Sequence, residues 1–198
     1  MLINGKRTLE GYQNKLKFDL GLDARPTILD GERVTVGGLR IGAQYRRVHR
    51  FGVGFYFLNS RIFSRDFGFP IEEELVEYDF GYTALYYERV LYFDRKWEFT
   101  TGIWLGGGNV SVMYNLAGLN DRVKYTDLPF SAVEMSMYGE YYFLHWLGLG
   151  AGLGYRHVSD LGPEVRDSFS GPVLVVKVQA NLFKLVRGIF DPKVKDEH

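Results

Sequence analysis

The stretch from Leu147 to Tyr155 alternates without a break between apolar residues at odd positions and glycine at the even positions 148, 150, 152 and 154. A period of two residues is that of a β-strand, with one face apolar and the other almost without side chains. Glycine is of little use on a solvated face, but in a narrow interior it leaves room for large side chains opposite. This stretch is therefore predicted to be one strand of a closed β-barrel in a membrane.

The same alternation recurs in seven further segments, at about residues 16–22, 34–45, 51–57, 76–86, 97–105, 133–143 and 174–182. Val34 and Val36 lie on the opposite parity from Leu39 and Ile41, which predicts a bulge at Gly37-Gly38. In the fourth segment Phe80, Tyr82 and the other apolar residues at even positions are predicted to face outward. The alternation is lost near Glu88 and Arg89. The fold class is all-β, an eight-stranded antiparallel up-and-down barrel.

The predicted connections alternate between long and short along the whole chain. The four long ones are Asp23 to Glu32, Asn59 to Glu74, Gly106 to Pro129 and Asp160 to Pro172. In an antiparallel meander all long loops then lie at one end and all short turns at the other, which is the layout of transmembrane β-barrels with short periplasmic turns and long extracellular loops. We expect the barrel at residues 14–183, between periplasmic tails at 1–13 and 184–198.

Aromatic residues flank the short turns and predict a girdle at the periplasmic interface. Its predicted members are Tyr45, Phe51, Tyr92, Phe93, Trp97, Tyr142, Phe143 and Trp146.

The charge balance excludes an electrostatic attraction to nucleic acid, since 24 Lys and Arg face 24 Asp and Glu. There is no cysteine for a disulfide or thiolate site. Glycine and asparagine interrupt the longest uncharged run, Phe99 to Asn120, so a spanning helix is not expected. The N-terminal residues lack the apolar segment of a signal peptide, and we expect any export signal to have been removed.

A soluble ligand-carrying barrel is the opposite arrangement, with its apolar residues inside. Glycine-rich second faces favour the membrane barrel, in which charges of both signs would line the lumen. Unpaired charges there are costly, so a paired network in a filled lumen is expected. The predicted lumen network is Lys17, Asp19, Arg40, Arg46, Glu77, Asp79, Glu98, Glu134, Glu140, Arg156 and Lys177.

The last third of the chain resembles a broad family. Leu128-Pro129-Phe130, then Glu140 to Phe143, and then Trp146 to Arg156 are similar to segments of the small outer-membrane β-barrel proteins common in Bacteroidetes. The resemblance implies a bacterial outer-membrane location. Most members have no assigned function, and some are accessories of secretion or assembly machines.

A second, local resemblance concerns His157 and Ser159, on the outward parity at the end of a late strand. Outer-membrane lipid A 3-O-deacylases carry a His-x-Ser-Asn segment facing lipid, followed by a Glu. Here Asp160 replaces the Asn, and Glu164 or Asp167 would have to orient the histidine. The alternative is that Arg156, His157, Ser159 and Asp160 form a polar rim at the lipid headgroups.

The leading hypothesis is a structural or accessory outer-membrane protein with a plugged lumen, which presents its loops or lipid-facing wall to a partner. Lipid ester hydrolysis is second and the soluble carrier third. The expected partners are outer-membrane lipid and lipopolysaccharide and another outer-membrane protein, without nucleic acid, cofactor or metal. Apolar loop residues would mark the contact surface: Phe63, Phe67, Phe69, Tyr114 and Leu116.

Overall fold

The computed structural model describes residues 16–29, 32–58, 62–64, 76–115, 122–144, 146–161 and 169–180. Both predicted tails, His145 and the two candidate carboxylates Glu164 and Asp167 lie outside the described residues. The strands are β1 (Lys17–Leu29), β2 (Glu32–Tyr45), β3 (His49–Leu58), β4 (Ile62–Ser64), β5 (Val76–Phe93), β6 (Trp97–Asn115), β7 (Arg122–Leu144), β8 (Leu147–Ser159) and β9 (Gly171–Ala180). No helix long and apolar enough to cross a membrane occurs among these residues.

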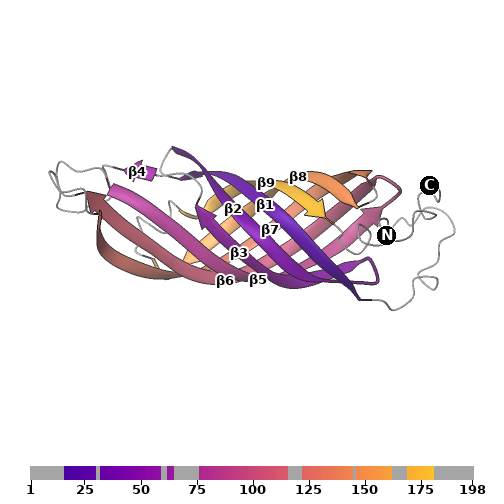
Figure 1. Ribbon diagram of the computed structural model, residues 1–198, viewed down its shortest axis with the longest axis horizontal. Helices are drawn as coiled ribbons and strands as arrows, with labels where there is room; N and C mark the ends of the chain where they lie inside the picture. Colours follow the sequence, from indigo (N-terminus) through magenta and orange to yellow (C-terminus); the bar gives the residue numbers. More distant parts are fainter. Residues whose placement is uncertain are drawn as a thin grey trace.

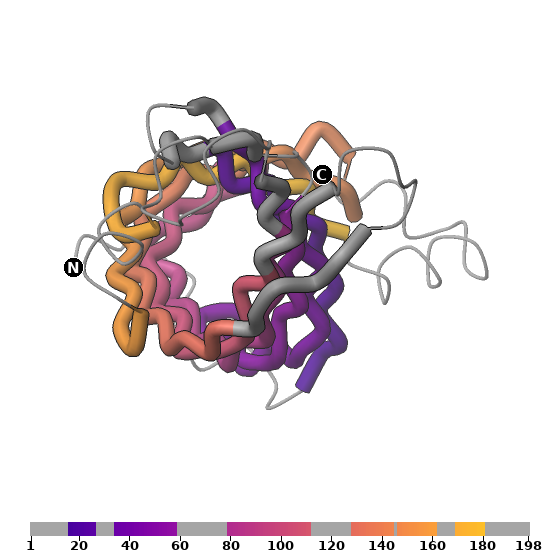
Figure 2. The backbone as a smooth tube through the Cα atoms, turned by 90° about the vertical axis from the view of Figure 1, so that its left-hand side faces the viewer, coloured from indigo at the N-terminus to yellow at the C-terminus, as the bar shows by residue number. Residues whose placement is uncertain are grey.

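The strands form one closed antiparallel barrel (Figures 1 and 2). Each strand pairs with the next along the chain, except that β3 and β4 both pair with β5, and β1 pairs with β9 to close the sheet. The short strand β4 continues alongside β5 where β3 stops, because Phe57 lies opposite Gly81 and Ile62 opposite Tyr78. β3 and β4 together therefore make one wall strand, and the predicted eight-stranded antiparallel barrel is confirmed.

The short turns lie together at one end, here called the short-turn end, where β1 begins and β9 ends (Figure 1). In the first turn Arg46 and Arg47 both have positive φ, 49° and 58°, and Val48 N donates to Tyr45 O at 3.2 Å. Two consecutive left-handed residues define a type I′ turn, which matches the twist of the strands it joins.

At the opposite end, here called the loop end, two predicted long loops are wrong. β1 runs through Pro26 to Leu29, which lies directly opposite Glu32. The pairing of β1 with β9 skips Arg25 and Pro26, so proline, which has no N–H to donate, leaves the strand intact. β6 and β7 likewise pair from Gly106 to Asn115, with β5 alongside β6 as far as Val76, so most of the predicted Gly106 to Pro129 loop is strand that projects at the loop end (Figure 1).

The predicted facing of two strands is also wrong at the loop end. β2 pairs with β1 in continuous register, without a bulge at Gly37-Gly38, and buries Val34 and Val36. β5 buries Phe80, Tyr82 and Tyr86 and exposes Asp79. The prediction assumed a polar interior throughout, whereas the interior near the loop end is apolar. The register shift in β5 lies between Val90 and Tyr92, beyond the predicted position near Glu88 and Arg89.

Candidate functional site

Buried charged side chains fill the part of the barrel interior nearest the short-turn end, here called the charged half. They occupy inward positions on β1, β2, β3, β5, β6, β7, β8 and β9. Six are carboxylates and five are cations: Asp19, Asp23, Glu88, Glu98, Glu134 and Glu140, and Arg25, Arg40, Arg50, Arg156 and Lys177. Groups of this kind are tolerated inside a protein only when they are paired and hydrogen-bonded.

Glu88 on β5 is the point where three cations converge. Arg40 donates a hydrogen bond to its carboxylate, and Lys177 Nζ lies 3.0 and 3.3 Å from its two oxygens. Arg50 Nη1 adds a longer ion pair of 3.7 Å. Because these partners come from β2, β9 and β3, the carboxylate joins walls that are far apart in the sequence.

Arg50 links two more carboxylates at the short-turn end. Its guanidinium donates to Glu98 and, at 3.1 Å, to Glu140, and Tyr142 accepts a hydrogen bond from it at 3.3 Å. Lys177 completes this cluster, since its Nζ lies 3.3 Å from Glu140 and donates to the Tyr138 hydroxyl at 2.6 Å.

Arg25 lies in the part of the charged half that is nearest the loop end. Its guanidinium pairs with Asp23 at 3.1 Å and with Glu134, and it lies between two rings, 4.6 Å from Tyr56 and 4.7 Å from Trp104. Aromatic faces attract a desolvated cation in this arrangement. Glu134 also accepts a hydrogen bond from Arg156 at 2.8 Å.

Asp19 differs from the other five carboxylates, because within the described part of the chain it forms no ion pair. It accepts hydrogen bonds from Gln179 Nε2 at 2.6 Å and from the Tyr86 hydroxyl at 3.5 Å, and both donors are neutral.

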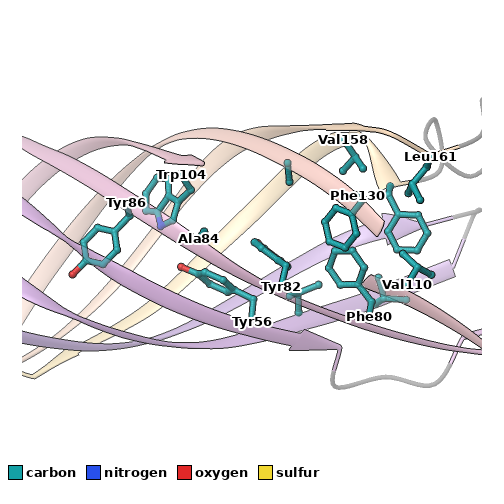
Figure 3. Close-up of a cluster of buried hydrophobic side chains, with 14 of the residues drawn as sticks. Tyr56, Phe80, Tyr82, Ala84, Tyr86, Trp104, Val110, Phe130, Val158 and Leu161 are labelled. Atoms are coloured by element: carbon teal, nitrogen blue, oxygen red, sulfur yellow. The ribbon is translucent and has the colours of Figure 1, made fainter. Parts of the chain in front are cut away.

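Aromatic and aliphatic side chains fill the interior nearer the loop end, here called the aromatic half (Figure 3). Phe80 stacks on Phe130 and Phe169, with ring centroids 4.7 and 5.1 Å apart. The remaining members are Val34, Val36, Tyr82, Val110, Val158 and Leu161. Tyr82 connects the two halves, since its ring packs edge-on against Phe130 and faces Arg156.

Seven of the predicted lumen residues lie in the charged half: Asp19, Arg40, Glu98, Glu134, Glu140, Arg156 and Lys177. The other four do not. Asp79 is exposed because β5 has the opposite facing, and Arg46 is exposed in the first turn with its guanidinium 5.1 Å from the Tyr45 ring. Lys17 is half-buried and interacts with another group, so it is not a free cation. The side chain of Glu77 is outside the part of the chain that the structure describes.

Sequence reasoning missed four members of the network. Asp23 and Arg25 share the parity of Asp19 and Gly21, but Pro26 predicts a loop at these residues. Glu88 shares the parity of Tyr86, which the sequence predicts to face outward, and Arg50 lies next to a short turn. Continuing each strand parity past its apparent stop would have found Asp23, Arg25 and Arg50.

The predicted girdle residues lie at the short-turn end, but not all of them are on the outer face: Phe93 lies opposite the inward Glu98. Trp97 packs against Tyr141 at 5.0 Å and Phe99 at 6.1 Å, and Tyr92 lies 6.1 Å from Phe99. Phe51 and Phe143 are exposed, and Tyr45, Phe93 and Trp146 are half-buried. Tyr142 points into the barrel instead, where its hydroxyl meets Arg50 and Glu140, because its parity is that of Glu140.

His157 and Ser159 lie where the apolar wall ends. Across β5, β6, β7 and β8, one ladder row reads Leu85, Leu105, Val133 and His157. The next row toward the loop end reads Thr83, Gly107, Ser131 and Ser159. The change from apolar to polar within one row marks the edge of the membrane-facing band on this side of the barrel.

No hydrogen bond joins the His157 ring to Ser159 or to a carboxylate in the part of the chain that the structure describes. The Ser159 hydroxyl donates to its neighbour Asp160 at 3.4 Å. Within the same residues there is no group of three or more His, Asp or Glu side chains that could hold a metal ion.

The exterior has the reverse polarity of the interior. Every long wall strand has exposed large apolar side chains. Leu153, for example, is 70% exposed and Leu85 is 65% exposed. Between Trp97 and Leu105 the outward positions cover roughly 27 Å of strand. A sheet closed on itself leaves no backbone edge unpaired, so such a wall is stable in lipid. The fold and this distribution define a transmembrane β-barrel protein of the outer-membrane type.

Comparisons with known proteins agree in fold only. No family model matches the chain, and a search of curated proteins found no match. Neisserial surface protein A (NspA) is 13% identical over 84% of this chain and 96% of its own, with a TM-score of 0.46. Ail, the attachment invasion locus protein of Yersinia pestis, in complex with the heparin analogue sucrose octasulfate, is 10% identical over 83% and 95%, with a TM-score of 0.48.

The N-terminal β-barrel domain of Pseudomonas aeruginosa OprF is also similar, at 10% identity over 84% of this chain and 98% of that chain, with a TM-score of 0.49. The strand pairing of this chain defines the barrel independently of these likenesses.

Proposed function

We propose that the protein is a non-conducting outer-membrane barrel with a structural or accessory role. The observation that carries the proposal is that the charged half and the aromatic half lie one above the other along the same axis. An ion entering at the short-turn end would have to displace paired charges, and it would then meet the stacked rings of Phe80, Phe130 and Phe169. An eight-stranded barrel is only wide enough to be filled by its own side chains.

Single-channel recording in planar bilayers tests this closure. The refolded protein is expected to give no conductance steps, while a general porin in the same bilayer gives them. A triple substitution of Phe80, Phe130 and Phe169 by alanine removes the ring stack of the aromatic half, and any conductance that it shows measures the contribution of these rings to the closure. Regular conductance steps from the unaltered protein, with its fold verified by circular dichroism, would overturn the proposal.

The accessory role is supported by the β5–β6–β7 extension at the loop end. β6 and β7 remain paired as far as Asn115 and Arg122, well past the polar row at Gly107 and Ser131. A paired ribbon presents a defined surface to a partner at a lower cost in conformational entropy than a flexible loop does.

A shortened ribbon separates this role from barrel stability. Ser111 lies opposite Asp127, so replacing residues 112–126 by Asn-Gly should leave a hairpin and an intact barrel. Proteins crosslinked to the intact chain in membranes and lost from the shortened chain would be the partners. If both chains capture the same set, or neither captures any, the ribbon does not present a partner surface.

A lipid ester hydrolase is the second hypothesis, because His157 and Ser159 share one outward face at the edge of the apolar band. A serine and a histidine at headgroup depth could act on an ester if a carboxylate oriented the imidazole. Incubation with lipid A, followed by mass spectrometry, tests it: deacylation by the parent protein that disappears in Ser159→Ala would establish the enzyme. An inactive parent protein would leave the polar rim as the role of both residues.

A further inference from the structure

Arg89 on β5 is a charged residue on the lipid-facing wall. Its neighbours Glu88 and Val90 are buried inside the barrel, whereas Arg89 itself is exposed on the outer face. Among the residues that the structure describes, its guanidinium has no ion pair and no hydrogen bond. A cation facing acyl chains is costly, and the cost falls toward the interface. Arg89 therefore calls for an anion supplied from outside the chain.

The surroundings of Arg89 place it at the depth of the interface. It lies opposite His49 on β3, and His49 Nδ1 is hydrogen-bonded to the Tyr87 hydroxyl at 2.8 Å. The aromatic pair Trp97 and Tyr141 lies on the adjacent strands β6 and β7, closer to the short-turn end than Thr101, the residue opposite Arg89. Polar and amphipathic aromatic groups gather at headgroup level in membrane proteins.

A groove of about 650 Å³ lies beside Arg89 on the same outer face, lined by Leu91, Phe99, Thr101, Met137, Gly139 and Ala151. It exists because Gly139 and Ala151 lie directly opposite each other on β7 and β8, so the wall there carries no large side chain. Leu91, the next outward residue on β5, lines the groove, and Arg89 lies opposite Thr101, which also lines it.

The groove runs from the girdle into the apolar band. Its Phe99–Gly139 row is the next row of outward-facing residues after the Trp97–Tyr141 row. The groove extends from there along β7 to Met135. Four residues of strand span roughly 14 Å. The occupant must therefore be narrow and apolar along its length and negatively charged at the end near Arg89.

We propose that this groove binds an anionic glycerophospholipid from the leaflet at the short-turn end, with one acyl chain over Gly139 and Ala151 and the phosphate against Arg89. A second copy of the chain fits less well. A two-fold contact through the same patch would bring a second cation, the other Arg89, into the interface without supplying an anion. This site goes beyond the proposed accessory role and requires only that the barrel is inserted.

Exchange of matched lipids into the refolded, full-length protein in detergent, followed by native mass spectrometry, tests the site. Phosphatidylglycerol and phosphatidylcholine with identical chains are the two probes. Phosphatidylglycerol should be retained in preference, and Arg89→Gln should reduce that preference about fivefold, the factor for one cation near an anionic surface. Arg95→Gln, which removes the same charge from an exposed turn, should keep it.

The acyl-chain part is tested by filling the groove. Ala151→Leu should lower the retention of both lipids, whereas Ala43→Leu, the same change at an outward position on β2, should not. Equal retention of the two probes by the unaltered protein, or equal losses from Arg89→Gln and Arg95→Gln, would overturn the headgroup assignment. The groove assignment would be overturned if Ala151→Leu retained both lipids as well as the unaltered protein does. It would also be overturned if Ala151→Leu abolished a dimer of the chain and left lipid binding unchanged. Neither result bears on conductance, which tests the closed barrel separately.

Discussion

The two halves of the barrel interior are filled by different means. Each buried group in the charged half depends on partners from other strands, as Glu88 does on Arg40, Arg50 and Lys177. The aromatic half needs only volume and ring geometry, as in the stack of Phe80, Phe130 and Phe169. The stability of the charged half should therefore depend on which polar atoms a substitution removes. The stability of the aromatic half should depend on how much side-chain volume is removed.

The largest effect is expected from Glu88→Gln in the charged half. Three cations would lose their shared carboxylate, and breaking a buried pair by removing one partner costs about 3–5 kcal/mol. Urea unfolding in lipid vesicles measures the loss. The double variant Glu88→Gln with Lys177→Gln should cost less than the sum of the two single changes. Additive costs would mean that lumen water, and not the pairing, solvates these charges.

Phe130→Ala should have the next largest effect, about 3 kcal/mol, through the cavity that it leaves beside Phe80 and Tyr82. Phe130→Leu keeps most of the volume and should cost under about 1.5 kcal/mol. The same unfolding assay compares them. If the two variants lose equal stability, ring geometry matters more than volume, and the contrast between the halves fails.

Glycine substitutions test how tightly the interior is filled. A Cβ on Gly152 would lie 2.1 Å from the Met137 carbonyl oxygen and 2.3 Å from Tyr138 Cβ, whereas on Gly81 its nearest contact would be 3.7 Å away. Gly152→Ala should therefore destabilise the barrel by about 1–3 kcal/mol. Gly81→Ala should stay within about 0.5 kcal/mol of the parent. Equal thermal midpoints for the two variants would show that the wall moves to accept the methyl group.

The smallest effect is expected at a turn, outside both halves. Asp94 accepts hydrogen bonds from the backbone N–H groups of Trp97 at 2.7 Å and Lys96 at 2.8 Å, and these hold the pKa of its carboxyl below the usual value. A lowered pKa stabilises the folded state above the ordinary pKa of aspartate, and this contribution is lost as pH falls through the lowered value.

Asp94→Ala should thus lower the thermal midpoint slightly at pH 7 and not at all in strong acid, where the parent carboxyl is protonated. Arg95→Ala, its neighbour in the same turn, serves as the control. A difference that persists in acid would show that the side chain acts through packing and not through its charge.

Much of the wall was predictable from sequence. The outward parity of β1, β3, β6, β7, β8 and β9 follows from strict alternation, and glycine at the inward positions predicted large side chains opposite. Gly102, for example, lies under the Trp104 ring and Gly148 under Tyr142. Most strands have one consistently apolar face, and period two then determines both the element and its orientation.

The errors in strand length and in the facing of β2 and β5 lie at the loop end. Inward residues there are apolar, so Phe80 and Tyr82 carry the same pattern as a lipid-facing strand, and Pro26 and the glycines of β6 imitate turns. The lumen network lacked Glu88 for a related reason, because Glu88 shares the parity of Phe80 and Tyr82 and is identified by partners such as Arg40, which lies 48 residues away.

By itself, the stretch from Leu147 to Tyr155 determined that the chain forms strands with an apolar outer face and an inner face that is packed against large side chains. Alternation is a local property, so it is written in consecutive residues. Only the tertiary structure decided that the crowding changes from ion pairs to stacked rings along the axis, and that an unpaired Arg89 stands beside a groove. Those features arise where strands distant in the sequence meet, and no local pattern encodes their register.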